Sequence, residues 1–408
     1  MEIPGYDVLV VGAGPGGVAT AIGAARAGLR PLVVDAAAFP RDKTCGDGLT
    51  IDAVRILHGL GIDIGAEPGA EPVTDVLITS PAGRPVEVPL PAGATPVAAT
   101  IPRLALDARL VARARELGLE VRDDCAVESL EVPGPADGPR GNADGEVVAH
   151  LADGTRVRAP WVVAADGHYS TVRRLVRPDD PVDLGSWHAA RQYFSNVRER
   201  RLQVLFEPDL LPGYAWVFPL PGGRANVGYG VLRGPGRKGH ELKALWPDLL
   251  ARPSMRRALG PDAIPEDRVR AWPIPAVFDV DDLATGRVLF VGDAANVADP
   301  MTGEGIAQAM TSGLLAAGAI AHGGSAAHVR EHYTLDVARE LGRDLHFAWR
   351  LQKLVRSPRA MEWALRAVDA TAWTRRNFGR WMFEDYPRAL LLTPDRWRRA
   401  VGAGRPGR

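Results

Sequence analysis

The chain has 408 residues, of which 46% are hydrophobic and 24% are charged, so it can bury a sizeable core and is not a disordered chain. Its 49 Lys and Arg balance 49 Asp and Glu, and this formal net charge of zero argues against a nucleic-acid-binding protein. The two cysteines, Cys45 and Cys125, make neither a disulfide framework nor a metal-ligand cluster, so we expect no metal site and a reducing, cytoplasmic environment.

The N-terminal part of the chain predicts a βαβ unit. Residues 7–11 are a continuous apolar run, as expected of a strand that is buried on both faces of a parallel sheet. Residues 15–28 then predict a helix, and residues 30–35 predict a second strand. The first residues carry no basic segment of the kind that begins a signal peptide, so we expect none.

The turn between the first strand and the helix is rich in glycine and reads Gly12-Ala13-Gly14-Pro15-Gly16-Gly17. Gly12 allows a tight turn, Gly14 lets a pyrophosphate approach the backbone, and Gly17 lets helix and strand pack closely. Asp35 ends the second strand, where its carboxylate can accept hydrogen bonds from ribose hydroxyls. This pattern predicts a dinucleotide-binding site but does not by itself distinguish FAD from NAD.

A second segment makes that distinction. The apolar run 287–291 ends at Gly292-Asp293, and residues 300–306, which read PMTGEGI, start a helix about ten residues later. Asp293 can hydrogen-bond a ribityl chain, and the helix beginning near Gly305 can direct its N–H groups at the pyrimidine oxygens of a flavin. NAD-dependent dehydrogenases need no such second site, so the two segments together predict FAD. The alternative interpretation is an ordinary helix-capping turn.

The remaining segments complete the expected architecture. Residues 104–117 predict an amphipathic helix, and residues 161–165 predict a further strand of the parallel sheet. Asp166-Gly167 resembles the Asp-Gly segment of flavoprotein hydroxylases and reductases, although a helix capped by Ser170 is equally compatible. Residues 75–100 and 187–232 contain strand patterns typical of an antiparallel sheet.

We therefore expect an α/β fold with three parts. The first is a discontinuous Rossmann-like FAD-binding domain made of residues 1–75, 101–180 and 270–322. The second is an antiparallel-sheet substrate domain, inserted as residues 76–100 and 181–269. The third is a C-terminal helical region, residues 323–408.

Three segments carry a more specific resemblance. Residues 42–49 read DKTCGDGL, residues 212–219 read PGYAWVFP with NVG at 226–228, and residues 300–306 read PMTGEGI. These segments resemble the geranylgeranyl reductase family, which includes menaquinone side-chain reductases, within the para-hydroxybenzoate hydroxylase-like FAD superfamily. Ile51-Asp52 and Met301-Thr302 depart from the Pro-Arg and Phe-Asn that are more usual there. Such changes can alter the substrate without altering the chemistry.

The resemblance implies an FAD-dependent reductase that saturates carbon–carbon double bonds of a polyprenyl or geranylgeranyl group, on a menaquinone side chain or a prenyl lipid. No second complete dinucleotide fingerprint is present, so NAD(P)H would bind transiently or a protein would donate the electrons. The family resemblance also implies a set of FAD contacts. These are Gly12, Ala13, Gly14, Pro15, Gly16, Asp35, Cys45, Gly46, Asp47, Gly48, Arg103, Asp293, Gly305 and Ile306.

Two other function classes stay open. An FAD-dependent monooxygenase or dehydrogenase that tailors a secondary metabolite shares the fold and the FAD motifs. A halogenase needs a reactive lysine, and no lysine occurs between Lys43 and Lys238. A prenyl-binding carrier that is not an enzyme would lose flavin contacts, whereas this chain keeps both ends of the FAD site.

Reduction of an isolated alkene needs a dry, aromatic site, because protonation of one carbon leaves a tertiary cation that then accepts hydride. Tyr214, Trp216 and Phe218 alternate on a predicted strand, so their rings share one face. These aromatic side chains can pack an apolar chain and stabilise developing positive charge. Ordinary core aromatics are the alternative interpretation.

Cys45 is the candidate proton donor, since a thiol is mostly protonated at neutral pH. Gly46 and Gly48 allow the backbone around it to lie close to the flavin. A small residue chosen for tight packing is the alternative. Glu304 is a second candidate acid, although its position at a helix N-terminus favours the charged form.

The C-terminal part of the chain predicts a membrane-surface contact. Residues 325–408 hold 17 Arg and Lys against 9 Asp and Glu, and no apolar run of about 18 residues predicts a spanning helix. We expect peripheral docking at the inner face of a membrane, where the isoprenoid substrate lies. The alternative is that the tryptophans close the core. The five tryptophans of this region are Trp349, Trp363, Trp373, Trp381 and Trp397.

Overall fold

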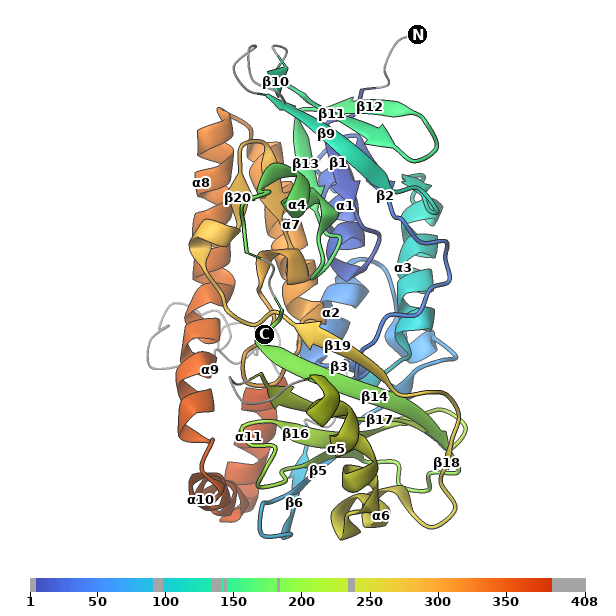
Figure 1. The fold of residues 1–408 in the computed structure, drawn as a ribbon, viewed down its shortest axis with the longest axis vertical. Coiled ribbons are helices and arrows are strands. Elements are labelled where there is room, and N and C mark those ends of the chain that lie inside the picture. The colour runs from blue at the N-terminus through green and yellow to red at the C-terminus, as the bar shows by residue number, and fades with distance from the viewer. Residues whose placement is uncertain are drawn as a thin grey trace, which may run out of the picture.

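The computed structural model describes residues 5–90, 98–133, 141–142, 145–181, 184–233 and 239–383. The chain forms one mainly parallel and one mainly antiparallel large sheet, which follow each other along the long axis of the molecule (Figure 1). The C-terminal helices run down one side and join the two regions (Figure 1). The expected α/β fold class is confirmed.

The six-stranded sheet has the order β20-β21-β13-β1-β2-β8. All neighbouring pairs are parallel except β20 with β21. The strands β1, β2 and β13 are buried along their whole length, which explains why their sequences are continuous apolar runs. The bounds are β20 (Ala284–Thr285), β21 (Val288–Phe290), β13 (Trp161–Ala164), β1 (Val8–Val11), β2 (Pro31–Val34) and β8 (Glu120–Arg122).

Helices α1 (Pro15–Arg26), α3 (Arg103–Glu116) and α7 (Ile306–His322) belong to this region. Helices α1 and α7 can pack closely because residue 313 is a glycine. A Cβ at this position would lie 2.4 Å from the carbonyl oxygen of Gly16. The loops that follow β1, β2, β13 and β21 all leave the carboxyl edge of the sheet. In open α/β sheets, ligands bind at this edge.

The antiparallel sheet has eight strands. Its order is β18-β14-β17-β16-β15-β5-β6, and β19 also pairs with β14. Arg270–Ile274, which we assigned to the first domain from the sequence, is this strand β19. The other bounds are β18 (Ile264–Pro265), β14 (Trp187–Ser195), β17 (Arg224–Leu232), β16 (Tyr214–Leu220), β15 (Leu202–Leu205), β5 (Asp75–Thr79) and β6 (Pro85–Pro89).

Two groups of helices cover this second sheet. Helices α5 (Gly239–Ala251) and α6 (Pro253–Leu259) bury Leu249 and Met255 in a cluster with Val227 and Tyr229 of β17. Residues of α9–α11 pack with β5 and β6 in a separate cluster that includes Val86 and Val88. The sheet therefore has helices from two different parts of the chain against it.

Smaller elements connect the large ones. A three-stranded sheet, β3-β7-β4, lies at the junction of the two regions, and a four-stranded sheet, β10-β9-β11-β12, caps the far end of the parallel region (Figure 1). The bounds are β3 (Gly48–Leu49), β7 (Ala99–Thr100), β4 (Glu71–Pro72), β10 (Gly141–Asn142), β9 (Val127–Pro133), β11 (Val147–Leu151), β12 (Arg156–Ala159), α2 (Ile51–Gly59), α4 (Thr171–Val176) and the short helices η1 (Ile64–Ala66), η2 (Val280–Asp282) and η3 (Gly292–Ala295).

The described part of the C-terminal region is helical. It consists of α8 (Ala326–Val337), the π-helical turn η4 (Ala338–Gly342), α9 (Arg343–Leu354), α10 (Pro358–Asp369) and α11 (Ala372–Phe383). Among the described residues, no helix combines the length and the apolar character that crossing a membrane requires. Trp397 and the other residues beyond 383 lie outside the described ranges.

Candidate active site

A cavity of about 910 Å³ lies where the two large sheets and the C-terminal helices meet. Its walls come from the loops at the carboxyl edge of the parallel sheet, from the antiparallel sheet, and from α9, α10 and α11. Segments from almost the whole length of the described chain therefore contribute to one site.

The glycine-rich turn forms one end of the cavity. Gly12 has a φ of +104°, and a Cβ there would lie 2.4 Å from the carbonyl oxygen of Ala165. A Cβ at Gly17 would lie 1.8 Å from the carbonyl oxygen of Gly12, so helix and strand can pack this closely only with glycine. The first helical residue is Pro15, and the N-cap is Gly14, which has no side chain to cap the helix. The N–H groups of this helix end are therefore available to an anion.

Asp35 lies beside this turn, as predicted from its place at the end of β2. Its carboxylate accepts hydrogen bonds from the backbone N–H of Ala13 at 2.7 Å and of Ala37 at 2.9 Å, which fixes its orientation at the cavity. A carboxylate has about four acceptor positions, so it can still bind ribose hydroxyls. Ala13 itself is fully buried and does not line the cavity.

Arg41 was not found by the sequence analysis. Its guanidinium lies 3.6 Å from Asp35 and donates to Asp107 at 3.0 Å. Its Nη2 is also 3.5 Å from the place a Cβ would take at Gly14. A positive charge thus lies directly beside the helix end that is suited to a pyrophosphate. The basic residues just before the Cys45 segment are the signal that could have identified it.

Asp293 lies at the opposite end, in η3 after β21. Its Oδ2 accepts a hydrogen bond from Lys43 Nζ at 2.9 Å, an ion pair across 250 positions of the sequence. Burial alone would raise the pKa of Asp293, but the charge and the hydrogen bond of Lys43 outweigh it and lower the pKa below its usual value. Gly305 is the N-cap of α7, and Ile306 is the first helical residue; both line the cavity. A second helix N-terminus without a capping side chain therefore faces the site.

The Cys45 segment crosses the cavity between these two ends. Cys45, Gly46 and Gly48 line it. A Cβ at Gly48 would lie 3.1 Å from the Phe218 ring, and one at Gly46 would lie 3.4 Å from the same ring. Glycine at both places therefore lets the segment lie flat against the aromatic strand.

The ionisation of Cys45 depends on its neighbours. Burial raises the pKa of the thiol, the Arg103 guanidinium lowers it, and the Asp47 carboxylate raises it, with a rise as the net result. Arg103 is itself buried and forms a bidentate pair with Asp107, at 2.9 Å and 2.8 Å. The thiol form therefore predominates at neutral pH. Arg103 lines the cavity, whereas Asp47, which we expected among the FAD contacts, is not among the lining residues.

The three aromatic residues share one face of β16, as their alternation predicted, and all three line the cavity. The ring centroids of Tyr214 and Trp216 are 6.0 Å apart, and those of Trp216 and Phe218 are 5.9 Å apart. Phe206 extends the row on the other side of Tyr214, at 6.1 Å. The rings therefore form a continuous aromatic wall.

The cavity continues from this wall into an apolar part that the sequence analysis did not anticipate. One side of it is the antiparallel sheet, with Val76, Ile78 and Val204. The other side is formed by the C-terminal helices, whose periodic apolar residues point inward. These lining residues are Leu351, Val355, Met361, Ala364, Leu365, Val368, Phe378, Trp381 and Met382.

Other residues singled out from the sequence have structural partners. Glu304 lines the cavity and accepts a hydrogen bond from Thr50 Oγ1 at 2.8 Å. The hydroxyl of Tyr214 donates to the carbonyl oxygen of Thr302. Ser170 caps α4 by accepting from the N–H of Arg173 at 2.9 Å, which confirms the capping interpretation.

Three of the four described tryptophans in the C-terminal region do not close the core, so that interpretation is wrong for these three. The exposed fractions of Trp349, Trp363 and Trp373 are 43%, 71% and 66%. Trp381 faces the cavity instead. Apolar residues between the tryptophans, such as Met361 and Leu365, form the packed side of these helices.

The site fits an extended dinucleotide that ends in a flavin. Two helix N-termini capped only by glycine face one cavity, and acidic side chains, Asp35 and Asp293, mark its two ends. One oxygen of Asp166, Oδ1, is buried at the same cavity without a hydrogen-bond partner among the described residues. These groups can hold the pyrophosphate, ribose and ribityl parts of FAD.

Comparison with known proteins agrees with this geometry. The model of the FAD binding domain family matches residues 5–328. A menaquinone reductase of Mycolicibacterium smegmatis is 33% identical over 376 residues, which cover 87% of this chain and 86% of that protein. A digeranylgeranylglycerophospholipid reductase of Methanocella arvoryzae is 29% identical over 369 residues, 86% and 87% of the two chains.

Among solved structures, a geranylgeranyl bacteriochlorophyll reductase-like protein from Thermoplasma acidophilum has the same fold. The TM-score is 0.77 at 22% identity, over 97% of this chain and 100% of that one. The family match covers most of the sequence, and the residues that it spans include the glycine-rich turn, Asp35 and Asp293. The chain therefore belongs to the family of FAD-binding flavoproteins that contains these reductases, and it is an FAD-dependent oxidoreductase.

Proposed function

We propose that this flavoprotein reduces carbon–carbon double bonds in the polyprenyl chain of a menaquinone or of a prenyl lipid. The observation that carries the proposal is the continuity of the cavity, from the FAD-binding loops along the aromatic wall and into the apolar part under α9–α11. The related menaquinone reductase and digeranylgeranylglycerophospholipid reductase support the same substrate class.

The apolar part of the cavity suits a long hydrocarbon. Its lining is almost entirely aliphatic and aromatic, and each methylene group that leaves water for such a site contributes about 0.8 kcal/mol. A polar tailoring substrate would have to give up its hydration there without gaining hydrogen-bond partners. This cost favours an isoprenoid over a polar secondary metabolite.

The residues also suit the chemistry of alkene reduction. Reduced FAD supplies the hydride when it is bound. Cys45 holds a proton at the cavity, because its thiol is the predominant form at neutral pH. The rings of Trp216 and Phe218 can stabilise the positive charge that develops when the proton is transferred to the alkene. Glu304 is less suited to this role, since it accepts a hydrogen bond from Thr50.

The cofactor contacts are assigned in the same way. Gly12, Gly14, Pro15 and Gly16 face the pyrophosphate, and Asp35 binds the ribose of the adenosine. Asp293 binds the ribityl chain. Gly305 and Ile306 direct the N-terminus of α7 at the pyrimidine ring, where negative charge gathers on reduction.

Product analysis tests the proposal. The FAD-loaded protein, reduced by dithionite without oxygen, is incubated with a menaquinone and, separately, with a digeranylgeranyl phospholipid. Dithionite also reduces the quinone ring of menaquinone, so the ring is first reoxidised in air. Mass spectrometry should then find a product whose prenyl chain has gained two hydrogens per reduced double bond. In air with NADPH, a monooxygenase would instead add an oxygen atom. Oxygen addition, or no conversion of either lipid, would overturn the proposal.

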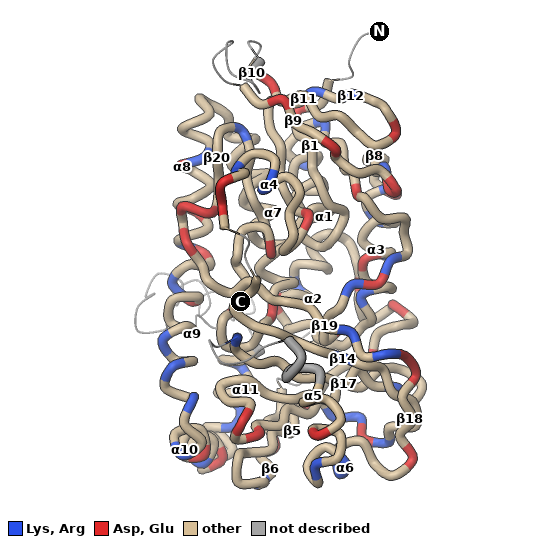
Figure 2. The backbone as a smooth tube through the Cα atoms, in the orientation of Figure 1, with Lys and Arg blue, Asp and Glu red and all other residues tan. Residues whose placement is uncertain are grey.

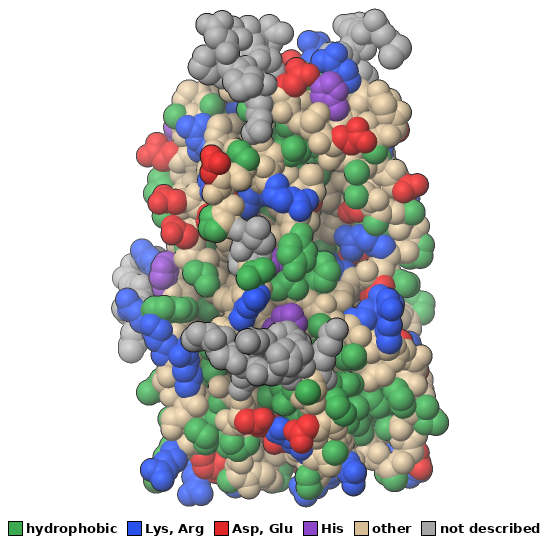
Figure 3. Space-filling view, viewed as in Figure 1, with side chains coloured by type: hydrophobic (Ala, Val, Ile, Leu, Met, Phe, Trp, Pro, Cys, Tyr) green, Lys and Arg blue, Asp and Glu red, His purple; other side chains and the backbone are tan. Residues whose placement is uncertain are grey.

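We also propose that the C-terminal helices contact a membrane at its cytoplasmic face, so that a lipid-borne isoprenoid can reach the cavity. Trp363 and Trp373 are largely exposed on α10 and α11, the same helices whose other side lines the cavity. Lys and Arg lie along α9, and basic side chains gather along this edge of the molecule (Figures 2 and 3). Exposed tryptophan and basic residues together are typical of surfaces that sit at the headgroup level of a bilayer.

A further inference from the structure

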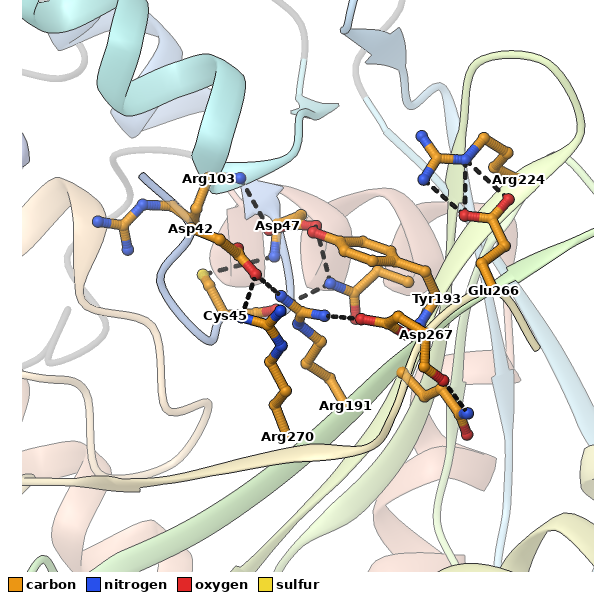
Figure 4. A network of polar contacts seen from close by, with 12 residues as sticks. Asp42, Cys45, Asp47, Arg103, Arg191, Tyr193, Arg224, Glu266, Asp267 and Arg270 are labelled. Atoms are coloured by element: carbon orange, nitrogen blue, oxygen red, sulfur yellow. Dashed lines mark hydrogen bonds and ion pairs between the residues drawn. The ribbon is translucent and has the colours of Figure 1, made fainter. Parts of the chain in front are cut away.

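Asp47 is a buried carboxylate directly behind the cavity. It is 1% exposed and has a φ of +65°, an uncommon conformation for a residue other than glycine. Its Oδ1 accepts a hydrogen bond from the backbone N–H of Arg103 at 3.1 Å. Its Oδ2 accepts from the Tyr193 hydroxyl at 2.7 Å and from Asn226 Nδ2 at 2.8 Å (Figure 4). One carboxylate thus connects α3, β14 and β17 to the Cys45 segment.

Asn226 extends this connection to both walls of the cavity. Its Nδ2 also donates to the carbonyl oxygen of Cys45 at 2.8 Å. Its Oδ1 accepts from the indole N–H of Trp216 at 3.0 Å. The backbone N–H of Asp47 in turn lies 3.4 Å from Cys45 Sγ. The thiol and the indole are therefore held in one hydrogen-bonded network whose centre is the Asp47 carboxylate.

The charges around Cys45 do not act equally. The Arg103 guanidinium favours the thiolate, but Asp107 neutralises it through two short hydrogen bonds. On the other side, the negative charge of Asp47 disfavours the thiolate, while its backbone N–H favours it. Burial raises the pKa of Asp47 to about 6, although hydrogen bonds from Asn226 and Tyr193 oppose the rise, so the carboxylate is charged at pH 8. The Arg191 guanidinium, 4.2 Å from the centre of the Tyr193 ring, pairs with Asp42 and Asp267 at 2.6 Å and 2.8 Å (Figure 4).

We propose that Asp47, Tyr193 and Asn226 are positioning residues, which hold Cys45 and the Trp216 indole in fixed positions relative to each other, and that the charge of Asp47 keeps the Cys45 thiol protonated. The part of this inference that concerns catalysis rests on the proposed function. The part that concerns the state of the thiol does not, and it can be tested without any isoprenoid substrate.

The first experiment measures alkylation of Cys45 by iodoacetamide in the FAD-loaded protein, followed by peptide mass spectrometry. Only the thiolate reacts, so the rate reports the thiolate fraction. In Asp47→Asn the rate at pH 8 should rise about tenfold, which corresponds to a fall of about one unit in the pKa of the thiol. Cys125, which is buried beside Asp35 in another part of the same cavity, is the internal reference and should not change. An unchanged or slower reaction of Cys45 would overturn the electrostatic role.

Asp267→Asn is the matched control for this change. Asp267 is also a carboxylate near Tyr193, since it accepts from the backbone N–H of that residue at 2.8 Å. Within the described part of the chain, it forms no hydrogen bond or ion pair with residues 45–48 and pairs with Arg191 instead. Its removal should leave Cys45 alkylation within about twofold of the wild-type rate. An equal acceleration in Asp267→Asn would show that any loss of charge loosens the site, and the proposal would then be wrong.

The second experiment compares Tyr193→Phe with Tyr333→Phe in prenyl reduction. Each removes one hydroxyl that donates a hydrogen bond within the protein, but that of Tyr333 donates to the carbonyl oxygen of Phe290, away from the cavity. Tyr193→Phe should lower kcat about tenfold with KM and FAD content within twofold, as expected when only the alignment of the donor changes. Equal kcat values for both variants would overturn the positioning role. If the wild type reduces no prenyl lipid while Asp47→Asn still accelerates alkylation, the proposed function fails and the thiol inference stands.

Discussion

Trp216 and Gly228 face each other across the paired strands β16 and β17. A Cβ at Gly228 would lie 2.4 Å from the indole ring and 2.4 Å from the carbonyl oxygen of Ala190. The space for the indole therefore depends on the absence of a side chain at position 228. This contact explains why an aromatic segment at 214–219 and a glycine at 228 occur together in one motif.

Gly228→Ala should therefore displace the Trp216 ring. Overpacking at a buried site costs about 1–3 kcal/mol, so the free energy of unfolding in urea should fall by about that amount. KM for the prenyl substrate should rise, because the aromatic wall loses its shape. Gly230→Ala is the control on the same strand, since its Cβ would meet nothing closer than 3.8 Å. Equal stability of the two variants would contradict the importance of this contact.

FAD binding can be separated from folding by two substitutions at the glycine-rich turn. We expect the purified protein to be yellow, with one FAD per chain. Gly14→Val should fold but lose FAD, because the folded chain has space at Gly14 and the pyrophosphate needs that space. Asp35→Ala should weaken FAD binding by removing the ribose acceptor. Absorbance at 450 nm after gel filtration measures the cofactor, and circular dichroism checks the fold.

A third substitution in the glycine-rich turn should affect folding rather than FAD binding. At Gly17 a Cβ would overlap the carbonyl oxygen of Gly12, so Gly17→Ala should impair folding itself. A wild-type protein that stays colourless after reconstitution with FAD, or a Gly14→Val variant that keeps its yellow colour, would contradict the assignment of this turn.

The sequence predicted those parts of the site that depend on local pattern. The glycine turn, Asp35, the row of aromatic residues and the start of α7 all follow from spacing within one or two elements. The pairing of Lys43 with Asp293 does not, because it joins positions that only the tertiary fold brings together. The sequence also did not predict that the buried face of α10 lines the cavity. Met361 and Leu365 are apolar, but any helix that packs against a core has apolar residues at such positions.

The direction of the Asp47 side chain could not be predicted from the sequence either. A family motif indicates that a segment lies at the cofactor, but adjacent residues in an irregular segment can point to opposite sides. Gly46 and Gly48 line the cavity, while the Asp47 carboxylate turns away to Tyr193. The hydrogen-bond partners that make this possible come from β14 and β17, far away in the sequence.

Asp47 gives a stability effect with a defined pH dependence. Burial raises its pKa from 3.8 to about 6, although hydrogen bonds from Asn226 and Tyr193 partly oppose the rise. The folded state therefore holds the proton more tightly than the unfolded state does. This contribution to stability is fully present below about pH 4 and is lost as the pH rises through about 6.

Relative to Asp47→Asn, the wild-type protein should lose about 2 kcal/mol of unfolding free energy between pH 4 and pH 7. Denaturant unfolding of both proteins across this range measures the difference. In Tyr193→Phe, this loss of stability should occur at higher pH, because the substitution removes a hydrogen-bond donor that favours the charged carboxylate of Asp47. A difference that stays constant with pH would mean that Asp47 does not titrate in this range.

Cys45 can be tested as the proton donor directly. Cys45→Ala should keep FAD but slow alkene reduction, by about 10²-fold if the thiol is the general acid, and Cys45→Ser should keep part of the rate. Rapid-mixing measurements of flavin reoxidation by a digeranylgeranyl phospholipid, which has no quinone ring to accept the electrons, give the rate of the chemical step. If both variants reoxidise at the wild-type rate, Cys45 is a packing residue, and Glu304 becomes the next candidate.

The last prediction concerns the membrane. Arg366 and Arg375 are paired with Glu362 and Asp369, which reduces the charge that they offer to a lipid surface. The tryptophans are therefore the sharper test: Trp363→Ala with Trp373→Ala should abolish most co-sedimentation with anionic liposomes. Leu335→Ala, which removes an exposed apolar side chain from α8, should have no effect.

Electrostatic attraction should still contribute, at about 1 kcal/mol for each basic residue that reaches the surface, so binding should weaken as salt is added. Neutral liposomes should bind less protein than anionic ones for the same reason. Because the side of α10 and α11 opposite Trp363 and Trp373 lines the cavity, the double variant should also slow reduction of the menaquinone side chain in liposomes. Reduction of the same menaquinone in detergent should be unaffected. If the wild type stays in the supernatant at low salt, the surface is not a membrane contact, and a substrate delivered from solution becomes the better explanation.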